Sequence, residues 1–145
     1  MTLLALASVR LFSQTPVEDL IIRYEDASGA RNFMAQGLKM TLARKLLDAT
    51  PLAPVAPDVE RLYVLKMAAV TQSVRLHFVS DLHATLEKYE YYGTHPSKNG
   101  TVDIYILRSD PETVEELVIY NPAIYSLNSL YGHFTMQELL SLDKK

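Results

Sequence analysis

The fold is decided by residues 101–134, which read TVDIYILRSDPETVEELVIYNPAIYSLNSLYGHF. Three apolar segments in this stretch are separated by Asp-Pro and Asn-Pro turn signals. The first alternates apolar and polar residues, as expected for a strand with one buried face. Tight turns join antiparallel neighbours, so the stretch predicts a three-stranded antiparallel meander. The predicted strands are 102–106, 114–120 and 124–134.

Helices and short strands are predicted before this meander. Thr15 and Pro16 have the chemistry of a helix start, with Thr as the N-cap and Pro at the first helical position. Val17, Leu20 and Ile21 follow at helical spacing. The predicted helices are 16–27, 37–49 and 71–89, and the predicted strands are 31–35 and 62–67.

The second helix carries a leucine stripe at Leu38, Leu42 and Leu46, which we expect to be its apolar packing face. The polar segment 93–100 is expected to be a loop. After the meander, Thr135 and Glu138 have the spacing of a capping box that opens a short final helix. The sequence therefore predicts an α+β fold, with a single mostly antiparallel sheet, helices packed on one face, and a C-terminal three-stranded meander followed by a short helix.

Composition excludes several classes of function. The chain has 145 residues, 48% hydrophobic residues and a net charge of −3, which is ordinary for one globular domain. It lacks the basic stripe of a nucleic-acid-binding protein. It also contains no cysteine, which excludes disulfides, thiolate catalysis and cysteine-ligated metal. We expect no cofactor and no nucleic-acid partner.

The N-terminus gives the expectation about compartment. Residues 3–7 read LLALA, an apolar run followed by small residues and too short to span a bilayer. We interpret residues 1–14 as a truncated signal-peptide remnant and residues 15–145 as a single α+β domain. The alternative is a short N-terminal helix or strand packed on the domain. No transmembrane segment is predicted, and we expect a periplasmic or secreted protein.

The order of landmarks also resembles a known family. The landmarks are LYVLKM at 62–67, YEYY at 89–92, VDIYI at 102–106, VEELVIYN at 114–121 and GHFTMQELL at 132–140. This pattern is similar to the uncharacterised family called domain of unknown function 4252. The resemblance implies a small exported protein of the Gram-negative envelope. Lipoprotein members have a cysteine after the signal, so its absence here predicts no lipid anchor.

Two groups of residues are candidate sites. His77 and His83 lie six residues apart on the third helix, so they face directions about 120° apart and cannot share one metal ion as an i, i+4 pair does. We expect no metal site and no catalytic residues. Tyr89, Tyr91 and Tyr92 cluster after that helix and form the candidate interaction surface. The alternative is ordinary packing of tyrosines against the sheet.

The expected function is a non-enzymatic exported envelope protein that acts as a binding or structural module. Its partner would be another envelope protein or a small ligand. The alternative is a small exported hydrolase-like enzyme, with a site assembled from dispersed residues such as His95 or His133. A deep pocket lined by a histidine and a carboxylate would favour the enzyme, whereas an exposed apolar or tyrosine-rich patch would favour the binding module.

Overall fold

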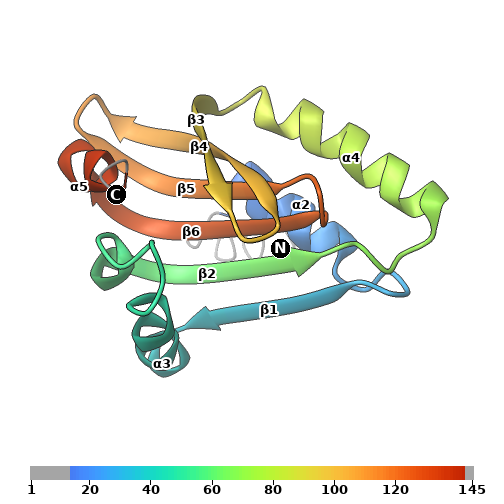
Figure 1. The fold of residues 1–145 in the computed structure, drawn as a ribbon, viewed down its shortest axis with the longest axis horizontal. Coiled ribbons are helices and arrows are strands. Elements are labelled where there is room, and N and C mark those ends of the chain that lie inside the picture. The colour runs from blue at the N-terminus through green and yellow to red at the C-terminus, as the bar shows by residue number, and fades with distance from the viewer. Residues whose placement is uncertain (1–13, 143–145) are drawn as a thin grey trace, which may run out of the picture.

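The centre of the structure is one six-stranded antiparallel sheet with the order β1-β2-β6-β5-β4-β3 (Figure 1). The structure is a computed structural model that describes residues 14–142. The strands are β1 Arg31–Gln36, β2 Val59–Lys66, β3 Glu90–Ser97, β4 Gly100–Asp110, β5 Thr113–Asn121 and β6 Ser126–Thr135. The helices are α2 Pro16–Tyr24, α3 Leu38–Leu47, the 3-10 turn η2 Ala56–Asp58, α4 Gln72–Leu86 and α5 Met136–Ser141.

The predicted sheet and C-terminal meander are confirmed. Strands β4, β5 and β6 pair in sequence order and antiparallel, because the turns between them are short. The closing helix α5 begins with the predicted capping box. The hydroxyl of Thr135 accepts a hydrogen bond from the backbone N–H of Glu138 at 3.0 Å, and the Glu138 carboxylate accepts one from the N–H of Thr135 at 2.8 Å.

Each face of the sheet has its own apolar cluster. Helices α2 and α4 bury residues such as Leu20, Phe78 and Leu82 on one face. On the other face, α3 and α5 contribute Met40 and Leu139. The sequence predicted helices on one face, and that arrangement applies to α2 and α4, while α3 and α5 lie against the opposite one.

The β3–β4 hairpin covers part of the second face. It bends across β5 and β6 in Figure 1, and it places Tyr92 and Val102 against the cluster that also contains Leu130. Both faces of the central strands β5 and β6 are therefore covered. This explains why β5 contains six consecutive buried residues, from 116 to 121.

Strand β3 corrects one expectation. The segment 93–100 was predicted to be a loop because it is polar and contains Pro96. In the structure, β3 is an edge strand that pairs with β4, and the hairpin turns between Ser97 and Gly100. Proline and polar residues are tolerated at an edge because one side of the strand needs no hydrogen-bond partner.

Gly132 lies where two segments approach each other closely. A Cβ atom built on it would lie 2.0 Å from the backbone carbonyl oxygen of Asp58. The register of β6 against β2 also shifts beside it, between Val59 and Arg61. The absence of a side chain at Gly132 therefore lets β6 lie directly against the backbone of η2 at this bulge.

Helix α3 corrects a second expectation. Its leucines Leu38, Leu42 and Leu46 were predicted to form the packing face, yet they are 88%, 66% and 72% exposed. The helix instead packs through Met40 and Ala43, which are buried. Helical spacing shows that the leucines share one side of the helix, but it does not show which side faces the sheet.

Candidate functional site

The three tyrosines of the candidate surface do not form one surface. Tyr89 is buried between α2 and the sheet, so it cannot belong to an exposed patch. Tyr92 packs against the cluster on the opposite face. Tyr91 is exposed, and its ring lies edge-on to that of Tyr105 with the ring centroids 5.5 Å apart.

The histidines considered as metal ligands lie on or near the surface. His77 contacts the backbone carbonyl of Ser73 at 3.0 Å, and the neighbouring acid Asp81 accepts a hydrogen bond from Tyr24 at 2.6 Å. Within residues 14–142, no three histidine, aspartate or glutamate side chains are grouped as metal ligands. His133 pairs with Glu60 at 3.2 Å on an exposed surface.

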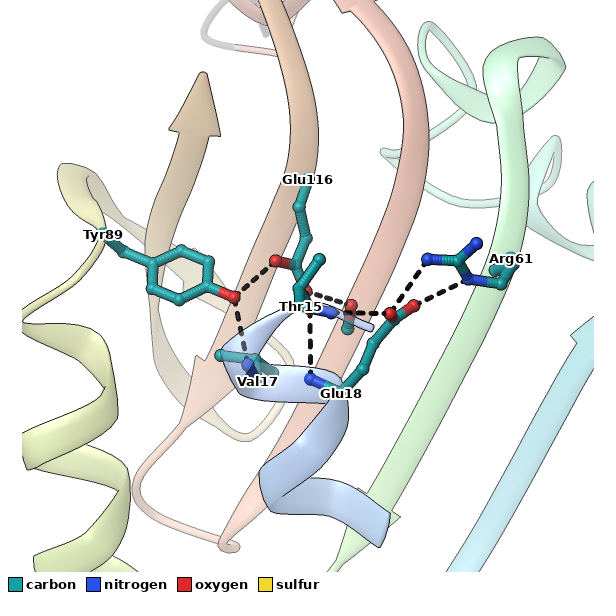
Figure 2. Close-up of polar contacts among 7 residues, drawn as sticks. Thr15, Val17, Glu18, Arg61, Tyr89 and Glu116 are labelled. Carbon is teal, nitrogen blue, oxygen red and sulfur yellow. Dashed lines mark hydrogen bonds and ion pairs between the residues drawn. The ribbon is translucent and has the colours of Figure 1, made fainter. Parts of the chain in front are cut away.

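A buried carboxylate, Glu116, is the centre of the most unusual polar cluster (Figure 2). Three hydroxyl groups donate hydrogen bonds to it. Tyr89 contacts one carboxylate oxygen at 2.5 Å, while Thr15 and Ser129 contact the other at 2.8 Å and 2.5 Å. The Tyr89 hydroxyl also accepts the N–H of Val17 at 3.0 Å. The cluster therefore joins the first turn of α2 to β5 and β6.

Burial raises the pKa of Glu116 to about 7. Removing the carboxylate from water is the largest cause, since it disfavours the charged form. The hydrogen bonds from Ser129, Tyr89 and Thr15 lower the pKa in part, and the nearby Glu18 raises it further. The pKa of Tyr89 is also raised, because burial and the neighbouring Glu116 carboxylate disfavour its ionised form.

A buried ion pair lies beside this cluster. Glu18 is fully buried and receives two hydrogen bonds from the guanidinium of Arg61, both 2.9 Å long (Figure 2). Its carboxylate also accepts the N–H of Thr15 at 3.0 Å, which completes the capping box of α2. The guanidinium carbon of Arg61 lies 3.9 Å from the ring centroid of Tyr131. These contacts fix the entry of α2 onto the sheet.

The strand register explains how the two acidic residues come together. Arg61 of β2 and Glu116 of β5 both pair with Tyr131 of β6, so the three form one row across the sheet. The start of α2 lies on this row and brings Thr15 and Glu18 to it. Adjacent residues of a strand point to opposite faces of the sheet, so Glu115 and Glu116 lie on different sides of β5, but this alternation does not identify Glu116 as buried. The apolar run that follows it, LVIY, was the available signal, because such runs are typical of strands covered on both faces.

The Glu116 cluster has the residue types of an acid–base site but lacks access for a substrate. Glu116 and Ser129 have no exposed surface in the structure. A general base must lie within hydrogen-bond reach of the proton that it removes. The cluster is therefore a structural connection whose charge depends on pH, and it gives no support to the hydrolase alternative.

Shallow hollows along α4 do not combine the residues of a catalytic site either. One is lined by Gln72, Ser73, Leu76, His77 and Ser80. A second lies between α4 and the β5–β6 turn, and includes His83, Tyr120 and Tyr125. Neither hollow has a carboxylate among its lining residues, whereas a histidine and a carboxylate together were expected for a dispersed hydrolase site.

The exposed side of α3 is the surface feature that sequence reasoning missed. Leu38, Leu42 and Leu46 lie in solvent on one side of this helix, and Phe33 of β1 is 39% exposed nearby, with the Lys39 ammonium 4.7 Å from its ring centroid. We call these four apolar side chains the α3 face. Contiguous exposed apolar side chains with a polar rim are typical of interaction sites.

Comparisons with protein-family models, with curated proteins and with solved structures found no match. The resemblance to domain of unknown function 4252 therefore stays a prediction. Among the described residues, no helix has the length and apolar character needed to cross a bilayer.

Proposed function

We propose that this protein is a non-enzymatic, exported binding module that attaches to its partner through the α3 face. One observation carries the proposal: three leucines at successive turns of α3 are mostly exposed, although the helix has a separate buried side. Transfer of a leucine side chain out of water is favourable, by about 1.5–3 kcal/mol for complete burial. A partner that covers them would recover this free energy.

The arrangement of the fold supports a binding role for α3. Helix α3 lies at the β1 edge of the sheet, away from α2 and α4 (Figure 1). Its buried residues Met40 and Ala43 pack against the sheet. The Arg44 side chain also donates a hydrogen bond to the backbone carbonyl of Val59 at 3.0 Å. The leucines are therefore held on a rigid support, which lowers the entropic cost of binding.

Site-specific crosslinking tests the binding surface. A photoreactive amino acid at Leu42 should crosslink to the partner in cells of the native host. The matched control is the same photoreactive residue at Leu76. This leucine is 63% exposed, and its helix, α4, packs against the opposite face of the sheet. Crosslinks to a macromolecule or lipid from position 42 and none from position 76 are expected. Equal or absent crosslinking at both positions would reject the α3 face as the binding surface.

The export part of the proposal rests on the apolar run before Gln14. Mass measurement of the protein from its native host should show residues 1 to about 14 removed, which is the outcome of signal-peptide cleavage. Fractionation of the same cells should place the shortened form outside the cytoplasm. An intact Met1 on protein recovered from the cytoplasm would contradict export and leave the binding surface unaffected.

A further inference from the structure

The charged residues around the α3 face are arranged symmetrically. Successive residues of a helix are rotated by about 100°, so Leu38, Leu42 and Leu46 cover an arc of about 80°. Lys45 lies about 20° outside one margin of this arc and Lys39 about 20° outside the other. Both lysines are exposed. The α3 face is therefore an apolar stripe with a cation along each side.

Helix α3 is also locally basic in a chain that is acidic overall. Its sequence, LKMTLARKLL, contains three cations and no acid, whereas the whole chain has a net charge of −3. The acid that follows it, Asp48, is the C-cap and lies about 80° from Leu38 around the helix, beyond the Lys45 margin. The charge complementary to this surface is negative.

We propose that the α3 face binds an anionic lipid surface. In this arrangement, which rests on the proposed binding role of α3, the three leucines and Phe33 enter the headgroup region and Lys39 and Lys45 contact lipid phosphates. A helix with leucine on one side and lysine at its margins is the pattern of helices that lie in the plane of a membrane interface. Lysine reaches phosphates from the margin because its long apolar stem packs beside the leucines.

The composition of the face favours lipid over a protein partner. Energetically dominant residues at protein interfaces are enriched in tryptophan, tyrosine and arginine, whereas leucine is under-represented. The α3 face has three leucines and one phenylalanine. The three leucines also form a ridge about 12 Å long on the outer side of the helix, from Leu38 to Leu46. A lipid surface can accept such a ridge without a preformed groove.

A second copy of the chain is a poor occupant. Packing α3 against α3 of another copy would place Lys39 and Lys45 of both copies along the same seam, with no acid on either helix to pair with them. Like charges brought together at an interface reduce affinity. Self-association through α3 is therefore disfavoured by its own charges.

A tryptophan reporter gives the direct test, because the chain contains no tryptophan of its own. Leu42→Trp and Leu76→Trp variants of the full chain are mixed with vesicles of phosphatidylcholine containing phosphatidylglycerol. The emission of Trp at position 42 should shift to the blue as the ring leaves water, while that at position 76 should not. This pair also separates binding by α3 from binding by any other part of the chain.

Co-flotation with the same vesicles measures the contribution of each side chain. Leu42→Gln should weaken binding about 10-fold, since it removes one inserted leucine. Lys39→Gln and Lys45→Gln should each weaken it about 5-fold, the effect of one cation near an anionic surface. Leu76→Gln is the matched control and should bind as the wild type does. Added salt or vesicles of phosphatidylcholine alone should weaken binding of the wild type.

Three results would overturn the lipid inference. The first is no blue shift at position 42 with anionic vesicles. The second is vesicle binding that Leu42→Gln leaves unchanged. The third is a concentration-dependent dimer that Leu42→Gln dissociates, which would make a second copy the occupant. If the vesicle tests fail while position 42 still crosslinks to a protein in cells, the binding role of α3 holds and only the lipid partner is rejected.

Discussion

The free energy of unfolding of this protein is expected to fall by about 3 kcal/mol as the pH rises from near 4.5 to near 7, through the titration of Glu116. Burial holds the pKa of this carboxyl at about 7 in the folded state, compared with an ordinary value of 4.5. The folded state therefore binds the proton more tightly than the unfolded chain does. Protonation stabilises the fold, so the contribution is complete below the lower value and is lost as the pH rises through the higher one.

Glu116→Gln should remove this part of the pH dependence, because glutamine stays neutral. Three hydroxyl donors surround the carboxylate, and no cation from residues 14–142 contacts it directly. The variant should therefore be as stable as the wild type at acid pH and more stable by about 3 kcal/mol near neutral pH. Urea unfolding of both proteins across the pH range measures the difference.

Two comparisons isolate the effect of Glu116. Burial also raises the pKa of Asp19 and of Glu138, so the difference between variant and wild type is informative, whereas the wild-type slope alone is not. Glu115→Gln removes the same charge from a neighbouring residue that is partly exposed. A Glu116→Gln profile parallel to that of the wild type would show that the carboxyl is not held at a raised pKa.

The meander and the closing helix could be predicted because their signals are local. Turn residues at 109–112 and 121–122 fix the pairing of β4, β5 and β6, and Thr135 with Glu138 fixes the start of α5. Strand β3 could not be predicted in this way. Its pairing with β4 depends on backbone hydrogen bonds at the edge of the sheet. These bonds form without alternating apolar residues, and Pro96 does not prevent them.

The sites depended on information that is not local. Periodicity grouped the leucines of α3 correctly, but tertiary packing decided that Met40 and Ala43 face the sheet instead. Similarly, alternation showed that Glu115 and Glu116 point in opposite directions, but only the covering of β5 by α2 makes one of them buried. Burial on both faces of a central strand follows from the whole topology, so neither the Glu116 cluster nor the α3 face could be derived from spacing alone.

The second large effect is expected at the ion pair between Glu18 and Arg61. Glu18 is fully buried, and in the full-length chain, where the N–H of Thr15 is a peptide amide, Arg61 supplies its only contacting cation among the described residues. Arg61→Met keeps most of the apolar volume of the Arg61 side chain. It removes both guanidinium hydrogen bonds and leaves the Glu18 carboxylate with the hydrogen bond from the N–H of Thr15. Removing one partner of a buried pair leaves an uncompensated charge, so the free energy of unfolding should fall by about 3–5 kcal/mol.

A double variant shows whether the loss comes from the stranded charge. Glu18→Gln keeps the capping box, since glutamine can accept the N–H of Thr15, and it removes the charge. Combined with Arg61→Met, it should therefore recover part of the stability lost in Arg61→Met alone, and the two changes should be far from additive.

The matched control is Arg108→Met. It breaks a bidentate ion pair with Glu90 whose two hydrogen bonds, 2.8 Å and 3.1 Å, are similar in length to those between Arg61 and Glu18. That pair lies on the exposed edge of the sheet, where water replaces the lost contact, so its loss should be much smaller. Urea unfolding at neutral pH compares the wild type, both single variants, the double variant and Arg108→Met. Equal losses in Arg61→Met and Arg108→Met would show that water reaches Glu18, and that the start of α2 is held to the sheet by the Glu116 hydrogen bonds instead of by this ion pair.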